Sequence, residues 1–252
     1  MFSLKGRVAV VTGASSGLGL QMAQGFAQQG ADLVLLARRM DRLKAIAEDF
    51  RAKGVRCLPL QCDVTDTEQV NQAAAAAIQE YGKVDILVNN AGAARNAGVL
   101  DMNDEDWNFT MEADLTSVFK VTRAFAKYMA EKKYGRIINI ASIYGQVGNT
   151  AMDTVAYHSS KGGVINFTRA VAAELAKYNI TCNTISPGYF ETELTSDTLK
   201  TEAFTAFMKA NVPLGRYGSE GELNPAAIFL ASDEASYITG QNIKVDGGFT
   251  SV

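Results

Sequence analysis

Short apolar runs alternate with helical patterns along most of the chain. The first run, Arg7–Thr12, is rich in β-branched residues and apolar on both faces, which suits a buried strand of a parallel sheet. Six further runs of this kind are Asp32–Ala37, Val55–Gln61, Val84–Val88, Arg136–Ala141, Asn179–Ser186 and Gln241–Val245. The alternation predicts an α/β fold, a doubly wound sheet of seven parallel strands with helices on both faces.

Helical patterns fill the segments between these strands. The predicted helices are a segment ending at Gln29, Asp41–Lys53, Thr67–Tyr81, Thr116–Glu131, Ala156–Tyr178, Thr195–Leu199 and Glu202–Ala210. No linker, internal repeat or low-complexity segment separates them. Residues 1–252 are therefore expected to form a single domain, because α/β folds of this length often form one domain.

Composition excludes several classes of partner. The net charge is −3 and no basic run stands out, so neither nucleic acid nor an anionic membrane is expected to bind. No signal peptide or membrane-spanning run is visible. The three cysteines form no CxxC pair and no metal-ligand cluster, which is typical of reduced thiols. We expect a cytoplasmic protein that needs no metal.

A glycine-rich turn follows the first predicted strand. The segment Gly13-Ala14-Ser15-Ser16-Gly17-Leu18-Gly19 leads from that strand into a helix, and this geometry aims backbone N–H groups at a phosphate. A plain tight turn is the alternative. The position after the first strand favours a Rossmann-type dinucleotide site that includes Gly13, Ser15, Ser16, Gly17, Leu18 and Gly19.

The second predicted strand ends at Arg38-Arg39, where a dinucleotide fold meets the adenosine ribose. A carboxylate there accepts from the 2′-hydroxyl, whereas Arg accommodates a 2′-phosphate. The first carboxylate here is Asp41, so we favour NADP, with NAD possible. The alternative is that the two Arg side chains solvate the start of the next helix.

Polar residues also follow the third and fourth predicted strands. Asp63, beside Val64, could accept from the adenine amino group or cap the helix that starts near Asp66. The fourth strand ends in Asn89-Asn90-Ala91-Gly92, where small residues let a cofactor approach and side-chain amides tie neighbouring strands together. Asp63, Val64, Asn90, Ala91 and Gly92 are therefore candidate cofactor contacts.

Tyr157 and Lys161 are four residues apart, and Ser142 lies a short way upstream. On a helix this spacing puts the phenol and the ammonium on one face, where the positive charge favours the phenolate. Such a Tyr can exchange a proton with a substrate oxygen. Alone, the pair could equally be a solvated helix face.

Together these motifs resemble the short-chain dehydrogenase/reductase family over nearly the whole chain. The motifs, in the family's order, are Thr12-Gly13-xxx-Gly17-x-Gly19, Asn89-Asn90-Ala91-Gly92, Ser142, Tyr157-xxx-Lys161, Pro187-Gly188 and Val245-Asp246-Gly247-Gly248. The resemblance implies reversible hydride transfer between a nicotinamide and an alcohol or ketone.

The resemblance also implies a role for each residue. Ser142 would donate to the substrate oxygen, Tyr157 would be the general acid or base, and Lys161 would bind the nicotinamide ribose and favour the Tyr157 phenolate. Pro187, Gly188 and Phe190 would line the nicotinamide, and Thr192 would lie near its carboxamide or a phosphate. His158, the one histidine, is expected to be a surface or packing residue.

Asp114 departs from the family's pattern and is included among the candidate catalytic residues. Many members carry Asn there, in a helix where it helps to hold a water in a relay to the active-site Lys. If the relay uses mainly the backbone carbonyl, Asp114 changes little. If the side chain matters, its charge partly cancels that of Lys161.

The segment Ile143–Ala156 looks like that of the gluconate 5-dehydrogenase group and related sugar or polyol enzymes. Within it, Gln146–Asn149 and Thr150–Thr154 would form one wall of the substrate site, and residues from Tyr189 to Val212 would form a mobile lid. By family analogy we expect a homotetramer.

Two other functions stay open. One is a 3-oxoacyl-(acyl-carrier-protein) reductase, for which Arg95, Lys132, Lys133 and Arg136 are the candidate carrier-protein contacts. The other is a non-catalytic NADP-binding sensor or scaffold.

Overall fold

A computed structural model describes residues 2–150, 152–192 and 195–252. Its strands form a seven-stranded sheet in the order β3-β2-β1-β4-β5-β6-β7, with every pair parallel. The strands are β1 (Val8–Thr12), β2 (Asp32–Ala37), β3 (Cys57–Gln61), β4 (Ile86–Asn89), β5 (Gly135–Ile140), β6 (Ile180–Pro187) and β7 (Asn242–Val245). The predicted α/β sheet of seven parallel strands is confirmed.

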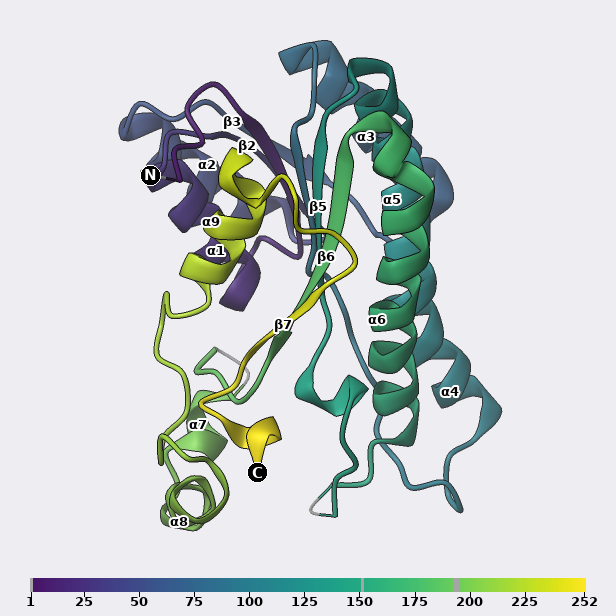
Figure 1. Cartoon of the computed structure of the whole chain (residues 1–252), viewed down its shortest axis with the longest axis vertical. Helices are drawn as coiled ribbons and strands as arrows, with labels where there is room; N and C mark the ends of the chain where they lie inside the picture. The colour runs from purple at the N-terminus through teal and green to yellow at the C-terminus, as the bar shows by residue number, and fades with distance from the viewer. Residues whose placement is uncertain (1, 151, 193–194) are drawn as a thin grey trace.

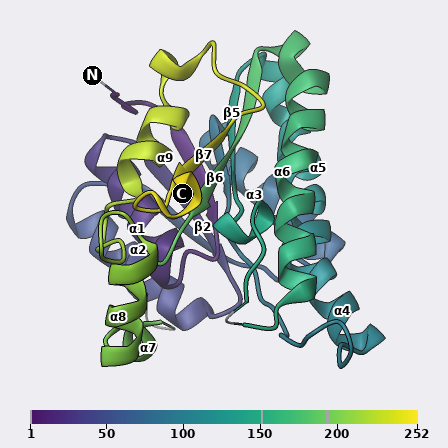
Figure 2. The ribbon, with the colours of Figure 1, turned by 60° about the horizontal axis from the view of Figure 1, so that its bottom comes forward.

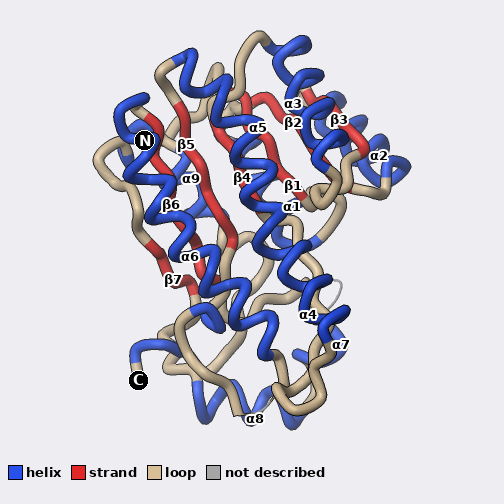
Figure 3. The backbone as a smooth tube through the Cα atoms, turned by 90° about the vertical axis from the view of Figure 1, so that its right-hand side faces the viewer, coloured by secondary structure: helices blue, strands red, loops and turns tan. Residues whose placement is uncertain are grey.

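Helices cover both faces of this sheet, as Figures 1 and 3 show. One face carries α1 (Gly17–Gln28), α2 (Met40–Ala52) and α9 (Asn224–Ala231), and the other carries α3 (Thr67–Tyr81), α5 (Ser117–Lys132) and α6 (Val155–Leu175). The two faces receive alternate side chains of the same strand. Leu33 and Leu35 of β2 pack in the first core, whereas Val34 and Leu36 pack in the second. This two-sided burial explains why the strands are unbroken apolar runs.

The chain reverses direction across the sheet between β3 and β4. From β1 it builds outward through β2 to β3, then crosses back to place β4 on the other side of β1. Ligands of doubly wound sheets bind outside the carboxyl ends of the strands at such a switch point. Three further helices, α4 (Asp104–Met111), α7 (Ser196–Leu199) and α8 (Glu202–Asn211), lie at that end of the sheet, which Figure 2 turns toward the viewer.

The structure corrects some predicted details. Helices α4 and α9 were not predicted, and a π-helical turn, Glu112–Thr116, joins α4 to α5. The predicted helix Ala156–Tyr178 ends as α6 at Leu175, and a 3₁₀ turn follows it. Among the described residues, no helix combines the length and hydropathy needed to cross a membrane. Ala151 of the predicted wall and Glu193 and Leu194 of the predicted lid lie outside the described residues.

Candidate active site

The turn after β1 leaves backbone N–H groups open to a ligand. Gly13 and Gly17 take positive φ angles of 65° and 56°, which a side chain would disfavour. Helix α1 begins at Gly17 after Ser16, whose side chain does not cap it, and its first turn holds no acidic residue. The unpaired N–H groups and the positive end of the helix dipole suit an anion such as a pyrophosphate.

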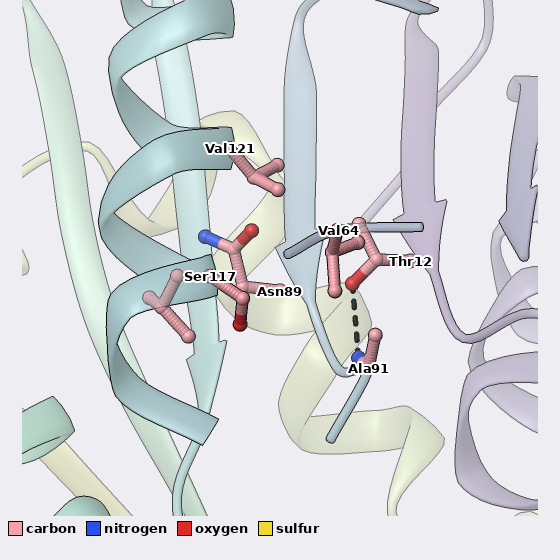
Figure 4. Close-up of a pocket in the computed structure, with 7 residues that line it drawn as sticks. Thr12, Val64, Asn89, Ala91, Ser117 and Val121 are labelled. Atoms are coloured by element: carbon pink, nitrogen blue, oxygen red, sulfur yellow. Dashed lines mark hydrogen bonds between the residues drawn. The ribbon is translucent and has the colours of Figure 1, made fainter. Parts of the chain in front are cut away.

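Hydrogen bonds from Thr12 fix the ends of β1 and β4 together. Its Oγ1 accepts from the backbone N–H groups of Asn90 and Ala91, both at 2.9 Å, and the second of these bonds is drawn in Figure 4. The side-chain amide of Asn90 donates to the Thr12 carbonyl at 3.0 Å. Asn89 instead points into the core, where its amide donates to Thr122 and Asn139. The two side-chain amides thus tie neighbouring strands as predicted, Asn90 joining β4 to β1 and Asn89 joining β4 to β5.

The two arginines after β2 lie beside the glycine-rich turn. One guanidinium nitrogen of Arg39 donates to the hydroxyls of Ser15 and Ser16, both at 3.0 Å. Arg38 is exposed, and within the described residues its guanidinium has no hydrogen-bond or ion-pair partner, although its carbonyl accepts from Gln61. Two cations and two hydroxyls thus gather where an adenosine ribose would end, which fits a 2′-phosphate.

Asp63 does not cap a helix. Its carboxylate accepts from the backbone N–H of Thr65 at 3.0 Å and from the Thr65 hydroxyl at 2.7 Å. Asp66 caps α3 instead, by accepting from the N–H groups of Glu68 and Gln69. The capping alternative for Asp63 was therefore wrong, and Asp63 remains on the wall of the cleft described next.

These segments enclose one side of a cleft of about 770 Å³. Every predicted catalytic or cofactor-binding residue lines it except Gly19, whereas the described residues of the predicted substrate wall, Gln146–Asn149 and Thr150–Thr154, do not. The predicted residues that line it are Gly13, Ser15, Ser16, Gly17, Leu18, Arg38, Arg39, Asp63, Val64, Asn90, Ala91, Gly92, Asp114, Ser142, Tyr157, Lys161, Pro187, Gly188, Phe190 and Thr192. Gly19 is buried behind the turn, where a Cβ would lie 2.6 Å from the Gly13 carbonyl oxygen. Gly19 therefore allows close packing of the turn and does not line the cleft.

The cleft also contains residues that sequence reasoning missed. Phe109 comes from the unpredicted helix α4, whereas Thr195, directly before α7, and Leu199, its last residue, belong to the predicted lid. Ala93 and Ala94 extend the predicted Asn-Asn-Ala-Gly motif by two positions. The small residues directly after Gly92 were a visible signal that the cleft continues there.

Ser142, two residues after β5, and Tyr157, in α6, line the same cleft. Ser142 caps the 3₁₀ turn Ile143–Gly145 that follows β5: its Oγ accepts from the backbone N–H of Tyr144 at 3.2 Å. That bond uses a lone pair, so the hydroxyl hydrogen of Ser142 stays free to donate. Tyr157 lies in the first turn of α6, and Lys161 follows one turn later with its ammonium 5.5 Å from the Tyr157 ring centre. Ser142, Tyr157 and Lys161 therefore line the same cleft, as predicted.

Lys161 is almost fully enclosed. Its ammonium donates to the carbonyl of Ile140 at 3.3 Å and lies 3.5 Å from a carboxylate oxygen of Asp114. Burial opposes the charge, but the charges of Asp114 and Tyr157 outweigh it and raise the pKa of Lys161 above its ordinary value. The ammonium is thus held in its charged form.

Asp114 has one engaged and one open carboxylate oxygen. Oδ1 accepts from the backbone N–H of Ala93 at 2.8 Å, and a Cβ on Gly92 would clash with it. Oδ2 is buried, and within the described residues no donor forms a hydrogen bond to it, so Lys161 is its ionic neighbour. The π-helical turn at Glu112–Thr116 brings this side chain to the cleft.

His158 has a packing role in this structure. Its Nδ1 lies 2.9 Å from the Thr154 carbonyl and 3.0 Å from the Thr154 hydroxyl, and its ring stacks on Tyr144 with the centres 4.8 Å apart. Among the described residues, no group of three or more His, Cys, Asp or Glu side chains could hold a metal ion.

A dinucleotide turn and a Ser-Tyr-Lys group in one cleft define a nicotinamide-dependent oxidoreductase fold. A family model described as enoyl-(acyl carrier protein) reductase matches residues 13–250. The chain is 37% identical over 250 residues to a gluconate 5-dehydrogenase of Gluconobacter oxydans, covering 99% of this chain and 97% of that one. It is 38% identical over 250 residues to a 3-oxoacyl-(acyl-carrier-protein) reductase of Escherichia coli, covering 99% and 100%.

Solved structures agree with this class. A gluconate 5-dehydrogenase from Burkholderia cenocepacia, in complex with NADP and tartrate, superposes with a TM-score of 0.95 at 37% identity, covering 100% of this chain and 98% of that one. A putative gluconate dehydrogenase from Agrobacterium tumefaciens gives 0.95 at 38%, with the same coverage. The chain belongs to the short-chain dehydrogenase/reductase family.

Proposed function

We propose that this protein transfers a hydride reversibly between NADP and a secondary alcohol or ketone. One observation carries the proposal: Ser142, Tyr157 and Lys161 open into the same cleft as the glycine-rich turn after β1. The bound nicotinamide supplies or accepts the hydride. The chain's own groups hold the substrate oxygen and move its proton.

Each group has a distinct task in this proposal. The free hydroxyl hydrogen of Ser142 donates to the substrate oxygen and orients it. Tyr157 gives that oxygen a proton in reduction and takes it back in oxidation. Lys161 stabilises the negative charge that then develops on the phenol, because the neighbouring charges of Asp114 and Tyr157 keep its ammonium charged despite burial.

We propose NADP as the preferred cofactor. The arginine and serine group formed by Arg38, Arg39, Ser15 and Ser16 offers charge-assisted donors for a 2′-phosphate. Asp63 and Val64 would line the adenine, and Pro187, Gly188, Phe190 and Thr192 the nicotinamide. The NADP complex of the Burkholderia cenocepacia relative supports the same preference. NAD remains the alternative cofactor.

For the substrate we propose a sugar acid or polyol. The relatives named above include gluconate 5-dehydrogenases and 3-oxoacyl-(acyl-carrier-protein) reductases alike. The four basic residues considered as carrier-protein contacts form no patch at the cleft. Arg136, at the start of β5, is 2% exposed and pairs with Asp233, and Arg95 pairs with Glu105 and Asp106. Lys132 and Lys133 end α5 just before β5 begins, at the amino ends of the strands and so away from the cleft.

We further propose that residues 1–252 form one dinucleotide-binding catalytic domain that assembles as a homotetramer in the cytoplasm. The continuous seven-stranded sheet supports one domain. Three buried, unpaired cysteines, Cys57, Cys62 and Cys182, support a reducing compartment. Light scattering of the purified protein tests the assembly, since a mass near that of one chain would reject the tetramer.

Hydride transfer is tested by following NADPH absorbance with 5-ketogluconate, a 3-oxoacyl thioester and a reactive diketone. The Tyr157→Phe variant removes the proton donor, and nicotinamide fluorescence checks that it still binds NADPH. We expect turnover to fall by on the order of 10²-fold or more while NADPH binding is kept. A non-catalytic sensor would instead bind NADPH but would transfer hydride to none of the three carbonyl compounds. Faster turnover of the thioester would favour the acyl reductase.

A further inference from the structure

Two tyrosine hydroxyls meet beside the active-site cleft, which Tyr189 lines. Tyr144 lies in the 3₁₀ turn Ile143–Gly145 directly after Ser142, and Tyr189 directly follows Pro187-Gly188. The hydroxyl of Tyr144 forms a hydrogen bond with the hydroxyl of Tyr189. These residues are 45 positions apart in the chain and belong to the segments after β5 and β6.

One of the two hydroxyl hydrogens of the pair has no acceptor among the described residues. Each phenol carries one O–H, and the bond between them uses only one of the two. Within the described residues, neither hydroxyl has a second hydrogen-bond partner. Burial raises the pKa of both phenols, so both stay protonated and the pair acts as a donor. One O–H therefore has an unmet need for an acceptor, whichever phenol donates to the other.

Packing fixes the pair in place. The ring of Tyr189 meets Phe204 and Phe207 of α8 and Phe249 near the C-terminus edge-on, with ring centres 5.2, 5.9 and 5.8 Å away. Tyr144 is stacked against His158. These contacts hold the two rings, and with them the positions of the two hydroxyl oxygens.

The pair also adjoins the reacting centre. Tyr189 lines the cleft together with Ser142 and Tyr157. The backbone of Tyr144 donates to the Ser142 hydroxyl, and the Tyr157 charge is near enough to help hold the Tyr144 phenol protonated. A substrate whose carbonyl meets Ser142 and Tyr157 therefore occupies the cleft that Tyr189 also lines.

We propose that the Tyr144–Tyr189 hydroxyl pair is a substrate subsite that donates a hydrogen bond to an oxygen on the carbon chain beside the reacting carbonyl. The inference rests on the proposed hydride transfer and defines its substrate class. A hydroxyl or a carboxylate oxygen supplies the missing acceptor. A purely apolar chain leaves a buried donor unpaired, so the subsite discriminates against it by on the order of ten- to a hundredfold in kcat/KM.

Three ketones of equal chain length test the subsite. One carries hydroxyls beside the carbonyl, one carries a carboxylate and the third carries only hydrogen. The variants are Tyr144→Phe and Tyr189→Phe, which keep the rings and their packing, and Tyr237→Phe, at a fully exposed phenol, as the matched control. NADPH titration and thermal unfolding check that each variant is folded and binds cofactor.

We expect the wild type and Tyr237→Phe to prefer an oxygen-bearing ketone. Tyr189→Phe removes the phenol that lines the cleft and should lose that preference through slower reaction of that ketone alone. Tyr144→Phe leaves the O–H of Tyr189 free to donate and should keep most of the preference. A preference for the hydroxyl or for the carboxylate identifies the acceptor. A preference unchanged in Tyr189→Phe, or equal losses on all three ketones in that variant, overturns the subsite.

A second readout is independent of turnover. D-Gluconate is titrated calorimetrically into NADPH-loaded protein, a pair that cannot react, and its affinity is expected to fall about tenfold or more in Tyr189→Phe but not in Tyr237→Phe. Equal affinities in the two variants contradict the subsite. If the wild type transfers hydride to no ketone, the proposed function fails first, and the calorimetric titration then decides the subsite alone.

Discussion

The carboxylate of Asp114 lies 3.5 Å from the ammonium of Lys161 inside the active-site cleft, and both side chains are buried. One oxygen of this carboxylate is held by the backbone of Ala93, which leaves the other to face the ammonium. A charge this close to Lys161 reduces the positive potential that Lys161 exerts on Tyr157. The side chain, and not only the backbone, thus reaches the catalytic group.

Replacing Asp114 by Asn is expected to shift the pH dependence of the reaction. The substitution removes the opposing charge but keeps the size of the side chain and its acceptor for Ala93. The limb of the pH–rate profile assigned to Tyr157 should therefore move to lower pH, by on the order of one unit. The measurement is kcat/KM against pH at saturating cofactor.

Glu112→Gln is the matched control for this shift. Glu112 lies on the same π-helical turn, but its carboxylate pairs with Lys120 rather than Lys161. Its profile should overlay that of the wild type. An unshifted profile with an unchanged rate in Asp114→Asn would mean that the carboxylate has no part in tuning the site.

Cofactor choice is expected to depend on Arg39. Arg39→Ala removes the guanidinium that bridges Ser15 and Ser16 and should weaken NADPH binding by roughly ten- to a hundredfold, because charge-assisted bonds to a phosphate are lost. NADH binding, which involves no 2′-phosphate, should change little. Arg38→Ala should act in the same direction, since its guanidinium also lines the cleft.

Nicotinamide fluorescence at fixed ionic strength measures these affinities. Lys44→Ala serves as the control, because Lys44 is an exposed cation on α2 that does not line the cleft. Equal weakening of NADPH and NADH by Arg39→Ala, or tighter NADH binding by the wild type, would refute the 2′-phosphate site.

The sheet and the glycine-rich turn could be predicted because their signals are local. The apolar runs that form β1 to β7 and the glycines after β1 are contiguous in the chain, and the Tyr157 and Lys161 spacing is that of one helical turn. Helix α4 was missed because it carries no apolar stripe. The signal for α4 was instead at the N-terminus of the helix, where the Asn103 side chain accepts from the backbone N–H of Asp106 and the first turn is acidic.

The contacts that join distant segments could not be predicted. Asp114 and Lys161 are 47 positions apart, and their distance depends on how the π-helical turn packs against α6. The contact between Tyr144 and Tyr189 depends on the packing of α8 against Tyr189. No sequence spacing encodes such pairs, because several packed elements determine them together.

A buried amide network between β4, β5 and α6 is expected to stabilise the fold. The Asn139 side chain accepts from Asn89 at 2.8 Å and donates to Thr168 at 2.9 Å, with none of its surface exposed. Asn139→Ala removes both bonds and leaves a small cavity, so the free energy of unfolding should fall by roughly 2–4 kcal/mol. Urea unfolding measures the change. Asn108→Ala, at an exposed position of α4, should cost far less, and similar costs for the two variants would argue against the network.

Glu222 gives a pH-dependent contribution to stability. Its carboxylate makes two contacts with Arg216, at 2.6 and 2.8 Å, and accepts from the backbone N–H of Ser219 at 2.7 Å. The Arg216 hydrogen bonds, with the Ser219 bond, lower the pKa of Glu222 to about 2 from its ordinary 4.5. Because the folded pKa lies below the unfolded one, the contribution is complete above pH ~4.5 and is lost as the pH falls toward 2.

Glu222→Gln should therefore be less stable than the wild type at pH 7, and the difference should narrow as the pH is lowered below ~4.5. Urea unfolding of both proteins at pH 7, 5 and 4 measures this difference. Glu220→Gln, at a neighbouring exposed carboxylate with no ion-pair partner among the described residues, should match the wild type throughout. A difference between Glu222→Gln and the wild type that grows on acidification would contradict the lowered pKa, because it would require the folded state to bind the proton more tightly than the unfolded state.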